Sequence, residues 1–308
     1  SQPTGVAFDA AANLFVADNA AGTILMVAPE GTTTTFASGL HNPQYLAFEP
    51  ATAVPQNIST RLAVQTDDNA LIAGFIITGT DPKNVIIRGI GPSLSKFGIA
   101  NPLQNPTLEL HNATSVIASN DDWNTASNAR QIPTILQPSD SRESAIMITL
   151  QPGPYTAVMS GKNGTTGVGL VEVYDLDQAP ISKLANISTR GFVDSGDNVM
   201  IGGFIVGGGD GSARVVVRAI GPSLTQFGVT NALADPTLAL HDSNGGAIAT
   251  NDNWKDTQQA AIEATGVPPS NDAESAITAI LPSGAYTAIV AGKGGATGVA
   301  LVEVYDLR

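Results

Sequence analysis

Cysteine is absent from the 308 residues of this sequence. Its absence excludes disulfide staples, thiolate zinc sites and a cysteine nucleophile together. Histidine is nearly absent too, with 3 residues in the chain, and His111 and His241 occupy equivalent positions in two repeats described below. One isolated histidine per repeat cannot form a metal centre within that repeat, so the sequence predicts no histidine-based metal site.

Charged residues are also scarce, at 13% of the chain, and 27 acidic against 14 basic residues leave a formal net charge of −13. Such a chain repels a phosphate backbone, so we expect no nucleic acid as a partner, and an anionic membrane surface is no better. No apolar run approaches the ~20 residues that span a bilayer, so we expect no membrane insertion. The low Lys content and the abundance of Thr, Ser, Asn and Gly favour a secreted, extracellular protein on a bacterial cell surface.

Glycine and proline are abundant, with 32 and 19 residues, beside a hydrophobic fraction of 43%. This balance is typical of many short strands joined by tight turns, and it gives no support to long amphipathic helices. We therefore expect an all-β protein. Its length allows two or three domains, each with its own core.

A long internal repeat organises the chain. Two segments share about half of their residues over ~120 positions, a period that is too long for a solenoid and fits whole tandem domains. We expect domains of one fold over 57–177 and 186–308, a linker over 178–185, and a separate segment over 1–56. The matching phrases are NISTR at Asn57 and Asn186, IGPSL at Ile90 and Ile220, NDDW at Asn120 with NDNW at Asn251, and LVEVYDL at Leu170 and Leu301.

Each repeat is predicted to form a β-sandwich of the jelly-roll kind. Runs of β-forming residues bounded by Gly, Pro, Asn and Asp give seven or eight short strands per repeat, as is typical of a two-sheet sandwich. Leu108 and Leu110 alternate with polar neighbours, which places them on the core face of one strand. We expect an edge strand over NISTRLAV, from Asn57, and one short helix within 125–135 and within its counterpart 257–265.

Two longer phrases recur in the latter half of each repeat. They read TLELHNATSVIASNDDW followed by ESAIMITLQPGPYTAVMSGKNG in the first copy, and TLALHDSNGGAIATNDNW followed by ESAITAILPSGAYTAIVAGKGG in the second. Together they resemble the bacterial pre-peptidase C-terminal domain family. This resemblance implies small β-sandwiches of the kind appended to secreted enzymes and surface proteins, and it leaves the NISTR and IGPSL portions unexplained.

The first fifty residues follow a different pattern. PTGVAFD at Pro3 and PQYLAFE at Pro43 are the same phrase forty residues apart, with NLFVADN, TILMVAP and TTTTFASG between them. This spacing predicts four strands per ~40 residues, and the phrases resemble NHL-type or SMP-30-like propeller blades. Because a propeller needs ~4–8 blades, two explanations stay open. Either the chain is a fragment of a longer propeller protein, or the single blade docks onto another surface, within the chain or on a neighbouring copy. Docking on a neighbouring copy by β-strand addition would build a fibre.

The sequence holds no recognisable pattern of catalytic residues. There is no GxSxG elbow, and Ser93 and Ser223 in the IGPSL phrases have no histidine nearby in sequence. The GK of SGKNGTTG lacks the spacing of a phosphate loop, and residues 162–164 are expected to form a hairpin turn that tolerates positive φ. We expect no enzymatic activity.

Clustered oxygen side chains suggest one cofactor, calcium. Hard oxygen donors on flexible turns suit Ca²⁺, and some relatives of the resembled sandwich family bind it. Capping of turns by Asn and Asp is the alternative role, because the clusters lack a full D-x-D-x-D-G loop. The candidate ligands are Asn120, Asp121, Asp122, Asp242, Asn251 and Asp252.

The two tryptophans of the chain, Trp123 and Trp254, follow those acidic loops. If exposed, each could stack on a sugar ring, and if buried, each would plug the end of a sandwich. Arg88 and Arg218 interrupt apolar strands, where an unpaired ion would be costly. We therefore predict that each arginine pairs with a glutamate of its own repeat.

Three functions remain open from the sequence. The first is a non-enzymatic extracellular structural subunit or adhesion stalk that associates with other copies of itself through strand edges. The second is an accessory region of a larger secreted enzyme that binds a carbohydrate or a calcium-dependent ligand. Exposed tryptophans would favour the second. The third is a fragment of a propeller enzyme whose catalytic blades are absent.

Overall fold

The computed structural model describes residues 2–9, 12–47, 54–66, 69–177, 182–207 and 211–307. It divides the chain into two compact units, Ser1–Ala51 and Thr52–Arg308. Each unit is described by itself.

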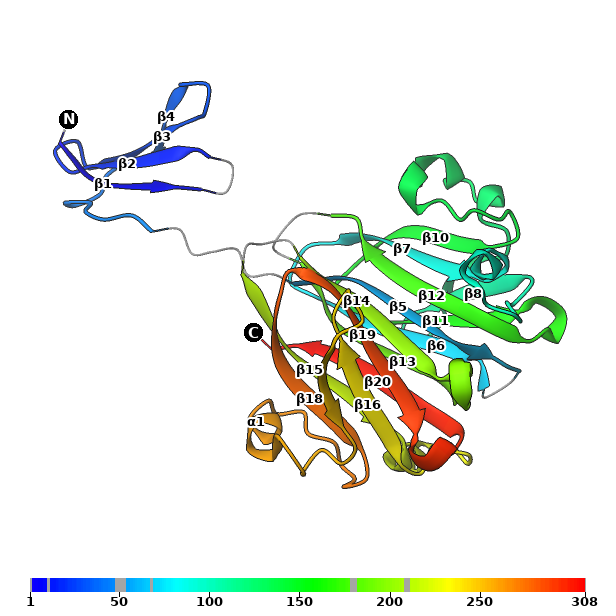
Figure 1. Cartoon of the computed structure of the whole chain (residues 1–308). Helices are drawn as coiled ribbons and strands as arrows, with labels where there is room; N and C mark the ends of the chain where they lie inside the picture. Colours follow the sequence, from blue (N-terminus) through cyan, green and yellow to red (C-terminus); the bar gives the residue numbers. More distant parts are fainter. Residues whose placement is uncertain are drawn as a thin grey trace. The chain divides into compact units, whose positions relative to one another are not determined.

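The N-terminal unit is a four-stranded antiparallel sheet in which the strands lie in the order of the sequence (Figure 1). Its strand count confirms the prediction for the first forty residues. Tight turns join the strands, and Gly22 and Gly31 adopt φ values of 64° and 89° that only glycine tolerates well. The strands are β1 (Pro3–Phe8), β2 (Leu14–Asp18), β3 (Thr23–Val27) and β4 (Thr33–Ala37).

The larger unit is an all-β sandwich, as predicted, and each repeat supplies eight strands within the described residues. The buried side chains of Leu108 and Leu110 confirm the expected alternation in β8. Repeat 1 forms β5 (Val54–Val64), β6 (Leu71–Thr78), β7 (Lys83–Ile90), β8 (Pro106–His111), β9 (Val116–Asn120), β10 (Ser144–Leu150), β11 (Gly153–Gly161) and β12 (Gly167–Asp175). Repeat 2 forms β13 (Lys183–Val193), β14 (Met200–Gly207), β15 (Ser212–Ile220), β16 (Pro236–His241), β17 (Ala247–Asn251), β18 (Ser275–Pro282), β19 (Gly284–Gly292) and β20 (Gly298–Asp306).

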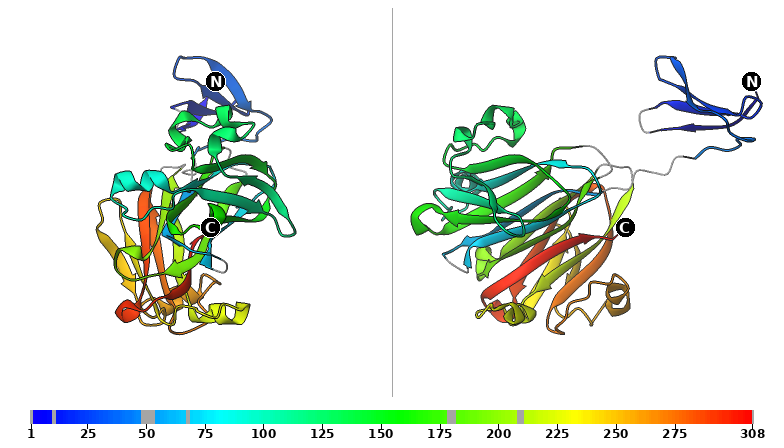
Figure 2. Two further views of the ribbon diagram at one scale, coloured as in Figure 1. Left: turned by 90° about the vertical axis from the view of Figure 1, so that its right-hand side faces the viewer. Right: turned by 180° about the vertical axis from the view of Figure 1, so that it is seen from behind.

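The two repeats share their sheets (Figure 2). Strand β5 of repeat 1 pairs on one side with β12 of its own repeat and on the other with β14 of repeat 2. Strand β13 of repeat 2 pairs in the same way with β20 and with β6 of repeat 1. The strand orders are therefore β10-β7-β12-β5-β14-β19-β16-β17 and β18-β15-β20-β13-β6-β11-β8-β9, with four strands of each repeat in both. Strands β5 and β13 also pair with each other at Ala63 and Phe192, which joins the two rows into one 16-stranded sheet.

This arrangement corrects the expectation of an edge strand over NISTRLAV. Strand β5, which contains that segment, lies in the interior of a sheet because its outer edge pairs with β14 from Val54 to Arg61. Lys183 already belongs to β13, while residues 178–181 of the expected linker lie outside the described residues. The boundaries expected for the repeats stay predictions; in the structure their strands belong to one unit.

A single hydrophobic core extends through both repeats. Near its centre the hydroxyl of Thr60 donates a 2.8 Å hydrogen bond to the hydroxyl of Thr189, so the two equivalent NISTR segments meet. Glycine is required where they approach the next strand. A Cβ atom on Gly74 would lie 2.8 Å from Ser188 Oγ, and one on Gly203 would lie 2.7 Å from Ser59 Oγ.

Short helical turns fill the connections. Helix α1 (Gln259–Glu263) confirms the expected helix in repeat 2, whereas the same stretch of repeat 1 forms the 3-10 turns η4 (Ala129–Gln131) and η5 (Thr134–Leu136). Pro133 explains the difference, because it cannot continue a helix that the alanines of repeat 2 favour. The IGPSL phrases form the 3-10 helices η2 (Pro92–Phe97) and η8 (Pro222–Phe227).

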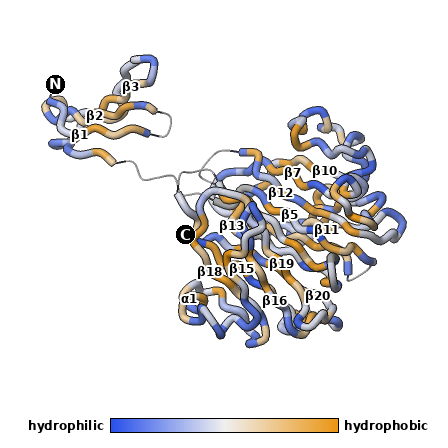
Figure 3. The backbone as a smooth tube through the Cα atoms, viewed as in Figure 1, coloured by the Kyte–Doolittle hydropathy of each residue, from blue (hydrophilic) through white to orange (hydrophobic). Residues whose placement is uncertain are grey.

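Apolar residues follow the strands of both units (Figure 3). Within the described residues, none of the helices is long and apolar enough to cross a bilayer.

Candidate functional site

Each repeat contains an arginine, a glutamate and a tyrosine on adjacent strands of one sheet. Arg88 on β7 lies opposite Glu172 on β12 and forms an ion pair with it. The same guanidinium lies 5.0 Å from the centre of the Tyr174 ring and donates a 2.9 Å hydrogen bond to the carbonyl of Leu136. Arg218, Glu303 and Tyr305 repeat this arrangement. The predicted pairing of each arginine with a glutamate of its own repeat is confirmed.

Burial and the neighbouring carboxylate keep these tyrosines neutral. Desolvation, followed by the charge of Glu172, raises the pKa of Tyr174 from 10.0 to about 12, and desolvation with Glu303 raises the pKa of Tyr305 to about 12. A tyrosine with a raised folded pKa stabilises the fold while it is neutral. Its contribution is complete below pH 10 and is lost as the pH rises from about 10 to about 12.

We therefore expect Tyr174 and Tyr305 to ionise late in an alkaline titration followed by phenolate absorbance, and burial also raises the pKa of Tyr286. Tyr174→Phe and Tyr305→Phe should each remove one tyrosine from the late group, and each should flatten the fall in stability between about pH 10 and about pH 12. Ionisation of every tyrosine in one step near pH 10 would contradict this assignment.

A buried glutamate holds the IGPSL turn in each repeat. Glu143, with 0% of its surface exposed, precedes β10 and accepts hydrogen bonds from the backbone amides of Gly91 at 3.1 Å and Ser93 at 2.9 Å. The Ser93 hydroxyl donates to the same oxygen, and the amide of Asp140 donates to the other. Glu274 makes the same contacts in repeat 2. Ser93 and Ser223 are thus donors to a buried carboxylate, and sequence reasoning missed this role.

The candidate calcium ligands Asn120 and Asn251 cap the outer edge of a sheet. Asn120 Oδ1 accepts a 2.9 Å hydrogen bond from the amide of Ala145 on β10, and Asn251 Oδ1 accepts a 3.0 Å bond from the amide of Ala276 on β18. Asp122 offers its backbone carbonyl to the amide of Thr125 at 3.0 Å. These contacts are of the turn-capping kind that was the alternative to calcium.

The aspartates of these loops lie beside lysines. Asp121 pairs with Lys162, and Asp252 Oδ2 lies 2.6 Å from Lys293 Nζ. These lysines belong to the predicted hairpin turns, where Asn163 confirms a positive φ of 56°. Asp242 lies apart from these loops, in the turn between β16 and β17. Its Oδ1 accepts hydrogen bonds from the backbone amides of residues 244 and 246.

The structure thus places each loop aspartate, Asp121 or Asp252, beside a lysine. It does not arrange the candidate ligands as a shell of oxygen atoms. In each loop the other oxygen, Oδ1 of Asp121 or of Asp252, is buried without a hydrogen-bond partner in the described part of the chain. One such oxygen is far fewer than the 6–8 that Ca²⁺ takes. Among the residues that the structure describes, no three His, Cys, Asp or Glu side chains are grouped to hold a metal ion. Calcium binding stays a prediction.

The two tryptophans differ in burial. Trp254 is 5% exposed and donates its indole N–H to the carbonyl of Asn271 at 3.1 Å, so it packs as a plug beside α1. Trp123 is half-buried and packs at the edge of a small cluster around Ile86 and Ile132. Sugar stacking by either tryptophan stays a prediction.

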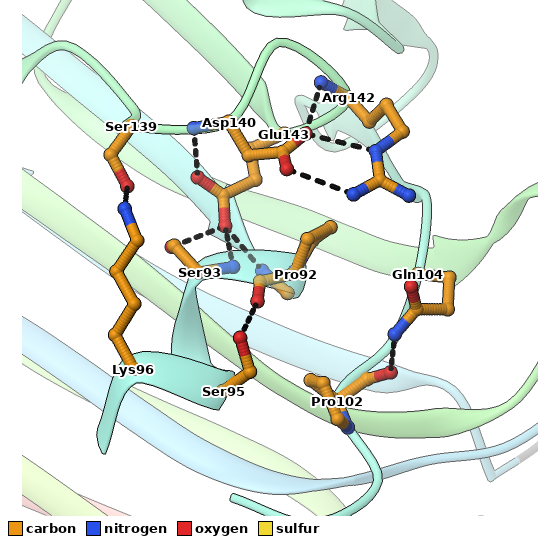
Figure 4. Close-up of polar contacts among 11 residues, drawn as sticks. Pro92, Ser93, Ser95, Lys96, Pro102, Gln104, Ser139, Asp140, Arg142 and Glu143 are labelled. Atoms are coloured by element: carbon orange, nitrogen blue, oxygen red, sulfur yellow. Dashed lines mark hydrogen bonds and ion pairs between the residues drawn. The ribbon is translucent and has the colours of Figure 1, made fainter. Parts of the chain in front are cut away.

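Repeat 1 contains a polar pocket above the Glu143 turn (Figure 4). Its volume is about 390 Å³. Lys96 reaches Ser139 Oγ at 3.0 Å, and Arg142 binds Asp140 through Nε and Nη2 at 2.9 and 2.8 Å. This contact with Arg142 lowers the pKa of the Asp140 carboxyl and raises that of the guanidinium. The pocket is therefore lined by two cations and one carboxylate, together with uncharged polar groups.

No protein-family model matches the sequence, and no curated protein matches it. Among solved structures, the chain is similar to the pre-peptidase C-terminal domain of a collagenase from Bacillus anthracis, with 12% identity, a TM-score of 0.25, and coverage of 42% of this chain and 99% of that chain. It is also similar to vicilin from tomato, Solanum lycopersicum, with 7% identity, a TM-score of 0.19, and coverage of 82% of this chain and 75% of that one. A DUF4785 family protein from Legionella pneumophila has 10% identity, a TM-score of 0.18, and coverage of 85% and 84%.

The first of these structures is a domain of the family that the sequence phrases resemble. The fold class of this chain rests on its own strand order, which is that of a β-sandwich. The solved structures give no support to the NHL-type resemblance, which rests on the sequence phrases.

Proposed function

We propose that this chain is a non-enzymatic structural or adhesion module of a bacterial surface that associates with other copies through its N-terminal sheet. The supporting observation is the apolar face of that sheet. Val6 and Phe8 on β1 are 60% and 64% exposed. A small sheet with one open apolar face is stable only when that face is covered.

The apolar face extends over three strands. Val6 lies opposite Val16, which lies opposite Leu25, and Phe8 begins a second row. Residues directly opposite one another project from the same face of a sheet. The two rows are Val6, Val16 and Leu25, and Phe8, Leu14 and Val27.

A second copy of this sheet is the partner that the chain itself supports. The phrase of β1 recurs at residues 43–49, and the described part of that copy lies against β1. The Thr4 hydroxyl donates a 2.6 Å hydrogen bond to the carbonyl of Pro43, and a Cβ atom on Gly5 would lie 2.7 Å from the Tyr45 amide nitrogen. A segment with the phrase of β1 thus packs against β1 without forming a strand, and we propose that a second copy of the sheet covers the open apolar face.

The sandwich, by contrast, is protected against strand addition at β10 and β18. The side-chain amide of Gln258 mimics a neighbouring strand, because it accepts from the amide of Thr278 and donates to its carbonyl, both at 3.0 Å. Asn128 donates to the carbonyl of Met147 at 2.8 Å in the equivalent place. Capped edges discourage pairing between molecules. Strand addition at β10 and β18 is thus disfavoured, and we propose the N-terminal sheet as the self-associating element.

The structural roles of the polar clusters support a non-enzymatic function. Glu172 neutralises Arg88, and Glu143 saturates the IGPSL turn, so both carboxylates are committed to holding the sandwich. A general acid or base must be free to exchange a proton with a substrate.

The proposal is tested by measuring molecular mass in solution over a range of concentrations. Wild-type protein is expected to exceed the 31.4 kDa of one chain at high concentration, and filaments should be visible by electron microscopy. Phe8→Asp should return the mass to that of one chain, because a charge would be buried in the apolar contact. Ile280→Asp, at a residue 72% exposed on β18, is the matched control and should behave as wild type.

A wild-type protein that stays at 31.4 kDa at high concentration would contradict the proposal. So would an effect of Ile280→Asp equal to that of Phe8→Asp, since it would place the contact on the sandwich. Circular dichroism of each variant verifies that the strands are retained.

A further inference from the structure

Two neighbouring cations line one pocket of a strongly acidic protein. Lys96 on η2 and Arg142 on the loop before β10 both line the pocket above the Glu143 turn. The Arg142 side chain is 48% exposed. With a net charge of −13, the chain has few basic groups, so two on one pocket make a local site for an anion.

Both cations are oriented by partners and keep donors free. Arg142 uses Nε and Nη2 on Asp140, which leaves Nη1 with two N–H groups. Lys96 gives one N–H to Ser139 and keeps two. A guanidinium fixed by a second residue loses little side-chain entropy when it binds a carboxylate.

The negative charge of the neighbouring Glu143 is compensated by hydrogen-bond donors within the protein. Glu143 lies beneath the pocket, and its oxygens accept from the Gly91, Ser93 and Asp140 amides and from the Ser93 hydroxyl. Its buried charge is thus compensated by four donors, whereas Lys96 and Arg142 are exposed to solvent.

Repeat 2 provides a natural comparison on the same scaffold. Its IGPSL turn and buried Glu274 make the same contacts as those in repeat 1. The two cations and the carboxylate of the pocket are nonetheless absent from the equivalent sequence positions. Gln226 replaces Lys96, Ala273 replaces Arg142, Asn271 replaces Asp140, and Ala234 replaces Gln104. Asn271 keeps the turn contact that Asp140 makes, since each accepts the amide two residues further on. Repeat 2 therefore forms the same turn without the charges of Lys96, Asp140 and Arg142, and we take these charges in repeat 1 as a sign of a ligand.

We propose that this pocket of repeat 1 binds a sugar that carries a carboxylate, such as a uronic acid. The carboxylate would accept from Lys96 Nζ and from Arg142 Nη1, the donors that Ser139 and Asp140 leave free. Gln104 gives its N–H to the carbonyl of Pro102 at 2.9 Å, so its amide oxygen can accept from sugar hydroxyls. Ile99, which is partly exposed at the pocket, supplies an apolar surface for the C–H face of the ring. A polyanion is disfavoured because the rest of the chain is acidic.

The test titrates the full chain with glucuronate, with glucose and with acetate, and follows binding by ligand-observed NMR. Glucuronate should bind, and added salt should weaken the binding. The variant Lys96→Gln with Arg142→Ala places the residues of repeat 2 in the pocket of repeat 1, so the fold should tolerate it. Its affinity for glucuronate should fall at least about 10-fold.

The reciprocal variant carries Gln226→Lys, Ala273→Arg and Asn271→Asp in repeat 2, and it should bind a second equivalent of glucuronate. Equal binding of glucuronate by wild type and by the Lys96→Gln, Arg142→Ala variant would overturn the proposal. So would no binding of glucuronate by wild type, or binding of glucose or acetate as strong as that of glucuronate. None of these outcomes depends on self-association of the N-terminal sheet.

Discussion

Replacing Glu143 with alanine should lower the free energy of unfolding by at least about 3 kcal/mol. The substitution leaves the Gly91 amide, the Ser93 amide and the Ser93 hydroxyl in the protein interior without their acceptor. Each buried donor left unpaired costs about 1–3 kcal/mol. The loss is measured by urea denaturation, and Glu274→Ala should produce a loss of similar size in repeat 2.

Two further variants separate the role of the acceptor from that of charge at the surface. Glu143→Gln keeps an oxygen in the same place, so it should cost less than alanine. Glu109→Ala removes a carboxylate whose side chain is 57% exposed, and it should change stability by no more than about 0.5 kcal/mol. If Glu143→Ala were as stable as Glu109→Ala, the buried turn contact would not stabilise the fold.

Replacing Phe75 with alanine should destabilise both repeats together. Phe75 is 1% exposed in the shared core and stacks on Tyr155 with ring centroids 5.6 Å apart. Removal of a buried phenylalanine costs about 3–5 kcal/mol. Strand β6, which contains Phe75, pairs with β13 of repeat 2. We therefore expect the free energy of unfolding to fall by the same amount in repeat 2 as in repeat 1.

The single tryptophan of each repeat makes this measurable. Trp254→Phe leaves Trp123 as the fluorescence reporter of repeat 1, and Trp123→Phe leaves Trp254 as the reporter of repeat 2. In either background, Phe75→Ala should lower the urea midpoint by the same amount. A midpoint reported by Trp254 that does not move would show that the repeats unfold as independent domains.

The sequence was sufficient for the fold class, the strands and the arginine pairs. Repeated phrases located the strands twice, and alternation placed Leu108 and Leu110 in the core. Arg88 within an apolar strand required a partner on energetic grounds alone, and Glu172 fills that role. In these places local pattern and burial lead to the same structure.

Pairing between the repeats could not be predicted. Two segments carry the same phrase, NISTR at Asn57 and at Asn186. The backbone hydrogen bonds at the edge of such a strand can be made by a strand of its own repeat or by the equivalent strand of the other repeat. Local sequence is compatible with both. The choice depends on long-range packing at positions such as Gly74, where Ser188 of the other repeat needs the space of a side chain.

The candidate sites had signals of two kinds. Glu143 and Glu274 precede apolar strands at equivalent positions, and a charge kept at such a place in both copies indicates a structural partner. The pocket of repeat 1 has the opposite signal, since Lys96 and Arg142 are positions where two otherwise similar copies differ. No sequence pattern indicated that Asp121 and Asp252 form ion pairs with lysines, because the lysines lie about 40 residues further along the chain.

The contacts between the repeats are reciprocal: β5 pairs with β14, and β13, the counterpart of β5, pairs with β6. This is the geometry of an isologous dimer whose two subunits occupy one polypeptide. Covalent joining makes the association independent of dilution, since the second subunit is always present. It also allows one subunit to acquire substitutions that the other lacks, which separate identical chains could not do. A binding pocket can therefore occur on one side of the pair alone.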